Sequence, residues 1–160
     1  MLERWRALYP DLELGPYQVT ARLSRAALHI ARSQEAVFAR FELNRGEVGV
    51  LSALRTAPPG AKLTPTKLFR GLMLSSAGMT SRLDRLERRG LLRRVPDPDD
   101  RRGVLLELTP VGRRLVDRAV AANTAEEAKL VGVLNPRETD AVAGLLQKLL
   151  DRLEPPNAKP

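Results

Sequence analysis

The stretch Asp97-Pro98-Asp99-Asp100-Arg101-Arg102-Gly103-Val104 decides the fold of this chain. It lies between two β-prone runs, residues 91–95 and 104–108, so we expect a β-hairpin there. Three acids and two arginines near its tip make it a poor core element, and we expect it to contact something outside the protein. Residues 76–89, immediately before it, form a predicted helix with four arginines. A cationic helix followed by an arginine-tipped hairpin is typical of a winged helix-turn-helix, which places the helix in a DNA major groove and the hairpin in the next minor groove.

The charge of the chain also favours a nucleic-acid partner. The net charge is +8 over 160 residues, with 27 Lys and Arg against 19 Asp and Glu. Residues 62–102 hold 11 basic and 5 acidic side chains, a net +6, which leaves +2 for the rest of the chain. A run of charge is often only a solvated face, but its concentration beside the hairpin favours binding to a phosphate backbone.

Several classes of protein are disfavoured by what the sequence lacks. With no cysteine, it has no disulfide framework, thiolate metal site or thiol redox sensor. No apolar run approaches the ~20 residues of a membrane span, and residues 1–5 lack the apolar core of a signal peptide. We therefore expect no membrane partner and a cytoplasmic protein of bacterial or archaeal type, associated with the nucleoid when bound to DNA.

Enzymatic and metal-binding sites are also poorly supported. The single histidine, His29, has no acidic partner at helical spacing, no Ser lies in a nucleophile elbow, and no Gly-rich loop precedes a P-loop lysine. The acids of the hairpin tip lack the glycine and the distal glutamate of an EF-hand, and Arg101 and Arg102 would repel a cation. We expect no enzyme activity, no cofactor and no metal ion.

Helix start and stop signals predict long terminal helices around a short α/β segment. We treat residues 1–160 as one domain, with residues 44–108 as a DNA-binding lobe and residues 15–43 and 109–153 as a helical dimerisation region. The predicted helix starts, in chain order, are Gly15-Pro16, Asn44 with Glu47 as a capping box, Thr64-Pro65, Ser75 or Ser76, Thr109-Pro110 and Asn135-Pro136. Gly90 is a good stop for the arginine-rich helix. The fold class that follows is mainly α with a small β-hairpin wing.

The arginine-rich helix has one apolar and one polar face. Met79, Leu83 and Leu86 recur at helical spacing and form the stripe that we expect to face the core. The opposite face carries small residues in the first turn and arginines further along. This pattern favours close approach to base edges, although a solvated surface helix would look similar. The predicted DNA contacts are Thr64, Ser75, Ser76, Ala77, Gly78, Thr80, Ser81, Arg82, Arg85, Arg101 and Arg102, with Asp100 expected to orient Arg102.

These segments resemble the MarR (multiple-antibiotic-resistance regulator) family of transcription factors. The resemblance rests on Leu63-Thr64-Pro65-Thr66, residues 75–91, residues 97–102 and Leu108-Thr109-Pro110, and it covers about residues 15–153. In the family's wing pattern, Asp-x-Arg is followed six residues after the Arg by Leu-Thr, and this chain matches that spacing. The resemblance implies a two-fold dimer built from the first, fifth and sixth helices, a wing arginine in the minor groove, and a ligand pocket where the dimer arms meet the reading lobe.

The terminal helices indicate a homodimer independently of that resemblance. Their apolar stripes are larger than a small winged-helix lobe could cover, although a long arm could bury its stripe within one chain. Two-fold pairing would present two reading helices about one DNA turn apart, and so predicts a pseudopalindromic operator in double-stranded DNA. The stripes comprise apolar residues from Val19 to Phe41 and, near the end, Val142, Leu145, Leu146, Leu149, Leu150 and Leu153.

A small organic ligand is the least constrained prediction. Branches of the family often answer to phenolic or other aromatic anions, and the residues that could stack on or pair with one here are Arg4, Trp5, Arg6, Tyr17 and His29. Hydrophobic anchoring of Trp5 and solvated packing of His29 are the alternatives. Members that sense urate pair such a tryptophan with an acid in the second helix, where this chain has Gly49, so urate is disfavoured.

The function predicted from the sequence is a homodimeric, sequence-specific DNA-binding transcriptional regulator, most simply a repressor relieved by a small aromatic or phenolic-type ligand. Two alternatives remain open. An architectural or non-specific DNA-binding protein would carry the same basic surface without an effector. A winged-helix protein-interaction module would direct its arginines to an acidic partner. Preference for an operator over random DNA distinguishes the regulator from the architectural protein. Weak binding to any duplex favours the protein-interaction module.

Overall fold

The computed structural model describes residues 2–59, 61, 63–71 and 76–154. In chain order, the elements are α1 (Leu2–Leu8), α2 (Gly15–Ala39), α3 (Arg45–Thr56), α4 (Pro65–Gly71), α5 (Ser76–Arg88), β1 (Leu92–Asp97), β2 (Asp100–Leu108), α6 (Pro110–Val131) and α7 (Pro136–Leu153). The predicted fold class, mainly α with one antiparallel hairpin, is confirmed.

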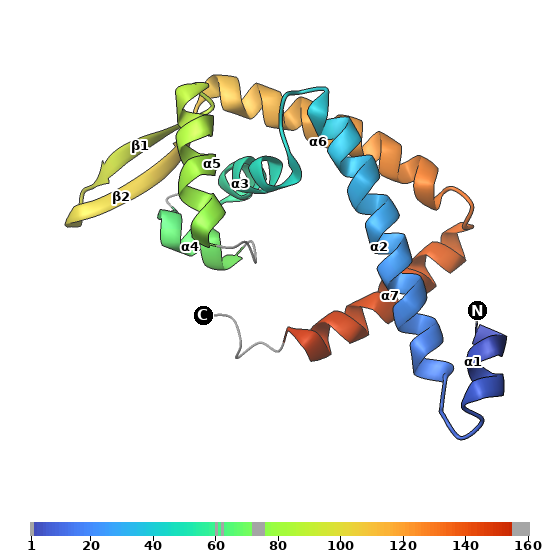
Figure 1. Cartoon of the computed structure of the whole chain (residues 1–160). Helices are drawn as coiled ribbons and strands as arrows, with labels where there is room; N and C mark the ends of the chain where they lie inside the picture. Colours follow the sequence, from blue (N-terminus) through green and yellow to red (C-terminus); the bar gives the residue numbers. More distant parts are fainter. Residues whose placement is uncertain (1, 60, 62, 72–75, 155–160) are drawn as a thin grey trace.

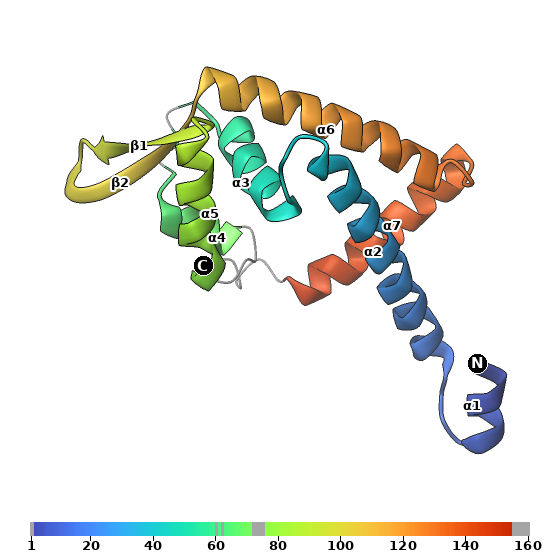
Figure 2. The ribbon, with the colours of Figure 1, turned by 45° about the horizontal axis from the view of Figure 1, so that its top comes forward.

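The elements form two parts that a long helix joins (Figure 1). At one end, α3, α4, α5 and the β1–β2 hairpin form what we call the hairpin lobe, from which the two strands project. At the other end, α1, α7 and the N-terminal half of α2 form the helical arm. Figure 2 shows α6 running from the base of the hairpin to the arm, and it packs against α2 and α3 on the way.

Capping boxes begin two of the helices where the sequence predicts them. At α3, the Asn44 Oδ1 accepts the backbone N–H of Glu47 at 3.0 Å, and the Glu47 Oε2 accepts that of Asn44 at 2.9 Å. Asn135 and Glu138 repeat this arrangement at α7. Such caps satisfy backbone donors that the first turn of a helix leaves unpaired, so they determine where each helix starts.

Two boundaries differ from the sequence prediction. The strands extend further into the tip than predicted, because β1 reaches Asp97 and β2 begins at Asp100 across a two-residue turn. The pairing continues past Pro96, which cannot donate a ladder hydrogen bond, because the register shifts between Pro96 and Asp97.

The chain also forms a short helix, α1, where no helix start was recognised. Trp5 stacks on Tyr9, four residues later, at the end of this helix. The sequence prediction relied on capping and helix-breaking residues, which give no sign of this contact.

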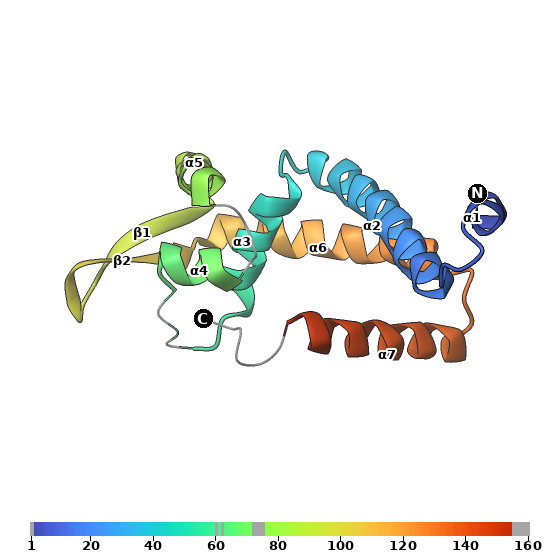
Figure 3. The same ribbon diagram turned by 60° about the horizontal axis from the view of Figure 1, so that its bottom comes forward.

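The apolar core lies inside the hairpin lobe and beneath α6. Leu83 and Leu86 of α5 are buried, which confirms two positions of the predicted inward stripe; the side chain of the third, Met79, lies outside the described set. By contrast, no residue of α7 is buried, and Figure 3 shows this helix apart from α6 along most of its length. The largest fully buried side chains are Leu51, Leu83, Leu86, Leu92, Glu47, Val50 and Val116.

A close contact joins the hairpin to α6 at the base of the lobe. Gly112, in the first turn of α6, lies so near Leu91 that an added Cβ would be 1.9 Å from the Leu91 carbonyl oxygen. The Thr109 hydroxyl oxygen accepts the Gly112 backbone N–H at 3.0 Å, and the hydroxyl donates to the Gly90 carbonyl at 2.7 Å. Gly90 has a φ of +65°, the left-handed conformation that glycine adopts without strain. The junction sets the direction in which the hairpin leaves the lobe.

We expect Gly112→Ala to destabilise the protein. The added methyl group would overlap a backbone atom, which cannot move aside as a flexible side chain can, and the cost should be about 1–3 kcal/mol or more. Urea unfolding followed by circular dichroism measures it. Gly15→Ala is the matched control, because a Cβ there meets nothing within 4 Å. Equal unfolding midpoints for the two variants would contradict this role of Gly112.

Candidate nucleic-acid interface

Helix α5 lies on the outside of the hairpin lobe, beside the strands (Figures 1 and 3). Thr80, Ser81 and Arg88 are exposed there, and Gly78 is partly buried. The helix therefore turns its predicted polar face outward, as the burial of its leucines requires. The predicted contacts whose side chains lie outside the described set are Ser75, Ser76, Ala77 and Arg101.

Two other predicted site residues have backbone partners. The Thr64 Oγ1 accepts the backbone N–H of Lys67 at 3.2 Å and so caps α4. The Asp100 Oδ1 accepts the backbone N–H of Arg102 at 2.9 Å, while the Arg102 side chain is exposed near the hairpin tip. Asp100 thus holds the backbone at the start of β2. Its effect on the direction of the Arg102 guanidinium stays a prediction.

An ion-pair cluster fastens the hairpin to α5. The guanidinium of Arg94 on β1 lies 2.7 Å from the Asp84 Oδ1 and pairs with the Glu87 carboxylate, and both acids are on α5. Glu87 also accepts the Arg94 backbone N–H at 3.1 Å. The hydrogen bond to Asp84, together with attraction to both carboxylates, raises the pKa of Arg94 above its ordinary value. The arginine therefore stays charged at every physiological pH, and these charge-assisted bonds hold the strand and the helix in one orientation.

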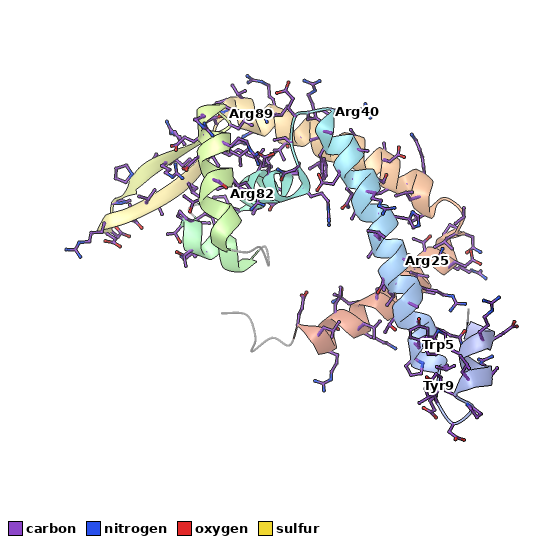
Figure 4. The ribbon with its side chains drawn as sticks, viewed as in Figure 1. Trp5, Tyr9, Arg25, Arg40, Arg82 and Arg89 are labelled. Atoms are coloured by element: carbon purple, nitrogen blue, oxygen red, sulfur yellow. The ribbon has the colours of Figure 1, made fainter. Side chains whose placement is uncertain are left out.

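A second arginine ties the end of α5 to the connection between α2 and α3. Arg89 donates to the backbone carbonyls of Phe41, at 3.3 Å, and of Glu42. Its guanidinium also lies 3.6 Å from the Glu42 carboxylate. Figure 4 shows Arg89 just past the C-terminal end of α5. The helix is thus linked both to the hairpin and to the end of α2.

Arg85, predicted to reach a base edge, also has a partner inside the lobe. Its Nε donates to the Glu47 Oε1 at 2.6 Å, while 52% of its side-chain surface remains exposed. Glu47 lies in the first turn of α3 and is 2% exposed. The guanidinium therefore extends from a buried carboxylate to the surface of α5.

Arg82 contacts α3, in contrast to the outward role expected for it. Its guanidinium lies over Gly46, where an added Cβ would come within 2.7 Å of it. Two of its nitrogens, Nε and Nη1, are buried without a hydrogen-bond partner in the described part of the chain. A cavity of about 620 Å³ lies beside it, between α2, α3 and α5, with a lining that includes Gln34, Glu35, Phe38, Gly49, Ser52 and Arg82. Contact between Arg82 and DNA stays a prediction.

The residues predicted for a ligand lie away from this cavity. Trp5 stacks on Tyr9, with ring centroids 5.6 Å apart, in the part of the arm farthest from Arg82 (Figure 4). The other predicted ligand residues are exposed on α1 and α2, namely Arg4, Arg6, Tyr17 and His29. None of them is in the cavity lining. The sequence reasoning missed the cavity because its residues form no motif; the available signal was a glycine, Gly46, in the first turn of a predicted helix.

Metal clusters and membrane spans are absent from the ranges that the structure describes. No group of three or more His, Cys, Asp or Glu side chains in those ranges is placed to hold a metal ion. Nor does any helix there combine the length and the apolar composition that crossing a membrane requires.

Comparison with known proteins identifies the family to which this arrangement belongs. A sequence model described as the MarR family matches residues 41–103, the segment that holds α3, α4, α5 and the tip of the hairpin. The HTH-type transcriptional regulator PecS of Dickeya dadantii is 34% identical over 149 residues, which cover 93% of this chain and 90% of PecS. The chain belongs to the MarR family.

Two further similar proteins support the same assignment. The HTH-type transcriptional repressor NicR of Pseudomonas putida is 28% identical over 144 residues, which cover 88% of this chain and 89% of NicR. A crystal structure of mutant MarR from E. coli complexed with operator DNA has a TM-score of 0.73 at 25% identity, covering 88% of this chain and 99% of that one. These relatives are transcriptional regulators, and this MarR-family chain is a DNA-binding transcriptional regulator with a winged-helix fold. We call α5 the recognition helix and the hairpin the wing, and contact of either with DNA stays a prediction.

We expect Arg82→Met to raise the stability of the protein. Burial of unpaired guanidinium nitrogens costs free energy, whereas a methionine keeps apolar packing over Gly46 without a charge. The free energy of unfolding in urea should rise by about 1–3 kcal/mol. Arg88→Met is the matched control, because the exposed Arg88 on the same helix should tolerate the change within about 0.5 kcal/mol. A loss of stability at Arg82 would mean that its guanidinium is satisfied where it lies.

Proposed function

We propose that this MarR-family protein is a homodimeric repressor that binds a pseudopalindromic operator and leaves it when a small organic anion binds. One observation carries the proposal: Arg94 of the wing pairs with two acids of α5. These ion pairs fix the orientation of the wing relative to the arginine-rich helix. A helix and a wing held in this way suit a major groove and the adjacent minor groove at once. A fixed orientation favours one DNA geometry, and hence operator recognition over non-specific binding. Repression, rather than activation, is proposed from the relation to NicR, a transcriptional repressor.

The proposed homodimer is supported by α7, whose apolar side chains have little cover within the chain. No residue of this helix is buried, and α2 exposes further apolar side chains. Two-fold pairing is the commonest way to cover such faces, and it would set two recognition helices side by side on one DNA face. The exposed apolar residues are Val19, Leu28 and Ile30 of α2 and Val142, Leu145, Leu146, Leu149, Leu150 and Leu153 of α7.

The proposal predicts that the intact chain sediments as a dimer and selects one duplex from a random pool. Arg102→Ala should weaken binding to that duplex, most where the flanks are A·T-rich, because their narrow minor groove concentrates negative potential. The dependence of log affinity on log salt should become shallower, since fewer counterions are released. Electrophoretic mobility shifts at several salt concentrations measure both effects.

Arg137→Ala, which removes the same charge from the exposed start of α7, is the control for the wing variant. It should leave operator affinity close to that of the parent. Equal binding of all duplexes by the parent would support the architectural alternative, and weak binding to every duplex would support the protein-interaction alternative. If Arg102→Ala matches the parent on the selected duplex, the hairpin does not act as a DNA-reading wing.

The proposed ligand is a small organic anion, and the cavity beside Arg82 supports that choice. Two buried guanidinium nitrogens, which have no partner among the described residues, could hydrogen-bond a carboxylate or phenolate. Phe38 and Val48 in the lining offer apolar contact to an aromatic ring. The rival location is the group predicted around Trp5, which also combines aromatic rings with arginines.

Phenolic carboxylates of one or two rings should bind the free protein and release it from the selected duplex, whereas neutral phenols of equal size should not. Arg82→Met should weaken that binding at least about tenfold, because a charge-assisted hydrogen bond is lost. Calorimetry without DNA measures the affinity, so the result does not depend on how the variant binds its operator. A loss caused by Trp5→Ala instead would move the site to the arm. No binding by any member of the series would remove the ligand from the proposal.

A further inference from the structure

Of the residues that the structure describes, Glu47 is the one charged side chain that is buried, with 2% exposure. A carboxylate taken out of water is costly unless hydrogen bonds and an opposite charge replace the lost hydration. A capping box does not require this burial. The equivalent Glu138 at the start of α7 makes the same two bonds with its asparagine while remaining exposed. The burial of Glu47 therefore has another cause.

The two carboxylate oxygens of Glu47 have different partners. Oε2 accepts the Asn44 backbone N–H at 2.9 Å and belongs to the cap of α3. Oε1 accepts the Arg85 Nε at 2.6 Å and so faces the recognition helix. The cap holds the carboxylate in place from one side, which gives Arg85 a fixed anchor rather than a mobile surface partner.

The use of Nε leaves the outer end of the Arg85 guanidinium for an external acceptor. A guanidinium has five N–H donors, and among the described residues only the Nε donor of Arg85 is engaged. The side chain is 52% exposed, so a guanidinium anchored at Nε can still offer its Nη groups at the surface of α5. Anchoring at Nε restricts the plane of the guanidinium before DNA arrives, which reduces the entropy lost when both Nη groups bind one base edge.

We propose that Glu47 is a positioning residue for operator recognition, which sets base preference by orienting Arg85 and makes no contact with DNA itself. The inference rests on the proposed function, since it needs a specific operator. Glu47 lies on α3, outside the recognition helix and the wing. An inspection of the residues expected to touch DNA would therefore not reveal its role. The group that would read the base is Arg85, and Glu47 determines how that group is presented.

Two simpler roles for Glu47 lead to different expectations. If it acted only through its charge, its neutralisation would raise affinity for every duplex, because one repulsion of the phosphates would disappear. If it acted only as a helix cap, its loss would lower stability and leave base preference unchanged. The positioning role alone lowers the preference for operator over other sequences, and this ratio is the quantity to measure.

The test uses the duplex that the parent protein selects from a random pool and a scrambled duplex of the same composition. Binding to both is measured for the intact parent, Glu47→Gln, Arg85→Ala, the double variant and Glu138→Gln. Glu138→Gln removes the charge of an exposed capping-box glutamate far from the recognition helix, so it controls for the cap. Urea unfolding confirms that each variant is folded under the binding conditions. Glu47→Asp, which keeps the charge but shortens the reach, replaces Glu47→Gln if that variant does not fold.

We expect Glu47→Gln to lower the ratio of operator to scrambled affinity about tenfold, the order of one lost base contact, and Glu138→Gln to leave it unchanged. The double variant should lose no more than Arg85→Ala, because Glu47 acts through that arginine. A ratio equal to that of the parent, or losses that multiply in the double variant, would overturn the inference. If the parent selects no duplex, the proposed function fails, and this result is distinct from a failure of Glu47 alone.

Discussion

The packing of α5 on the first turn of α3 is the interaction on which the rest of this structure depends. Leu83 and Leu86 of α5 are buried in the core, at about 1.5–3 kcal/mol for each fully buried side chain. Apolar burial has no direction, so alone it would leave the helix free to turn about its own axis. The polar contacts remove that freedom, because Glu47 bonds Arg85 and the missing side chain of Gly46 leaves room for Arg82. The same turn of α3 thus receives two of the arginines that the recognition helix carries.

The recognition helix is held from two further directions, and this links its position to the rest of the molecule. Arg94 joins it to the wing, and Arg89 joins its end to the connection between α2 and α3. The cavity beside Arg82 lies where α2, α3 and α5 meet. An occupant of that cavity would contact α2 and the recognition helix together. A small shift of the recognition helix caused by the occupant would therefore change the position of its outer face directly, with no flexible loop in between.

Much of the fold follows from local signals, whereas the site follows from them only in part. Capping residues such as Asn44 and Asn135 act within one helical turn, so the starts of α3 and α7 could be predicted without knowledge of the partner elements. The outward face of α5 follows from the spacing of its leucines. The strand ends could not be predicted in the same way, because pairing near the tip depends on how the register accommodates Pro96. The inward contact of Arg82 depends on Gly46, which is remote in sequence and joins no recognisable motif.

By itself, the sequence determined the six helices from α2 to α7, which face of α5 is apolar, and that a basic helix precedes a hairpin, because these properties arise from neighbours within a few residues. Only the tertiary structure decided how the arginines are used. On a helical wheel, Arg85 lies opposite the apolar stripe and Arg82 lies on its flank, but neither position identifies a partner. In the folded chain, Arg82 covers Gly46 beside a cavity, and Arg85 bonds a buried carboxylate while its end stays exposed. A long side chain reaches several ångströms from its helix, so its partner is chosen by what another part of the chain places within that reach.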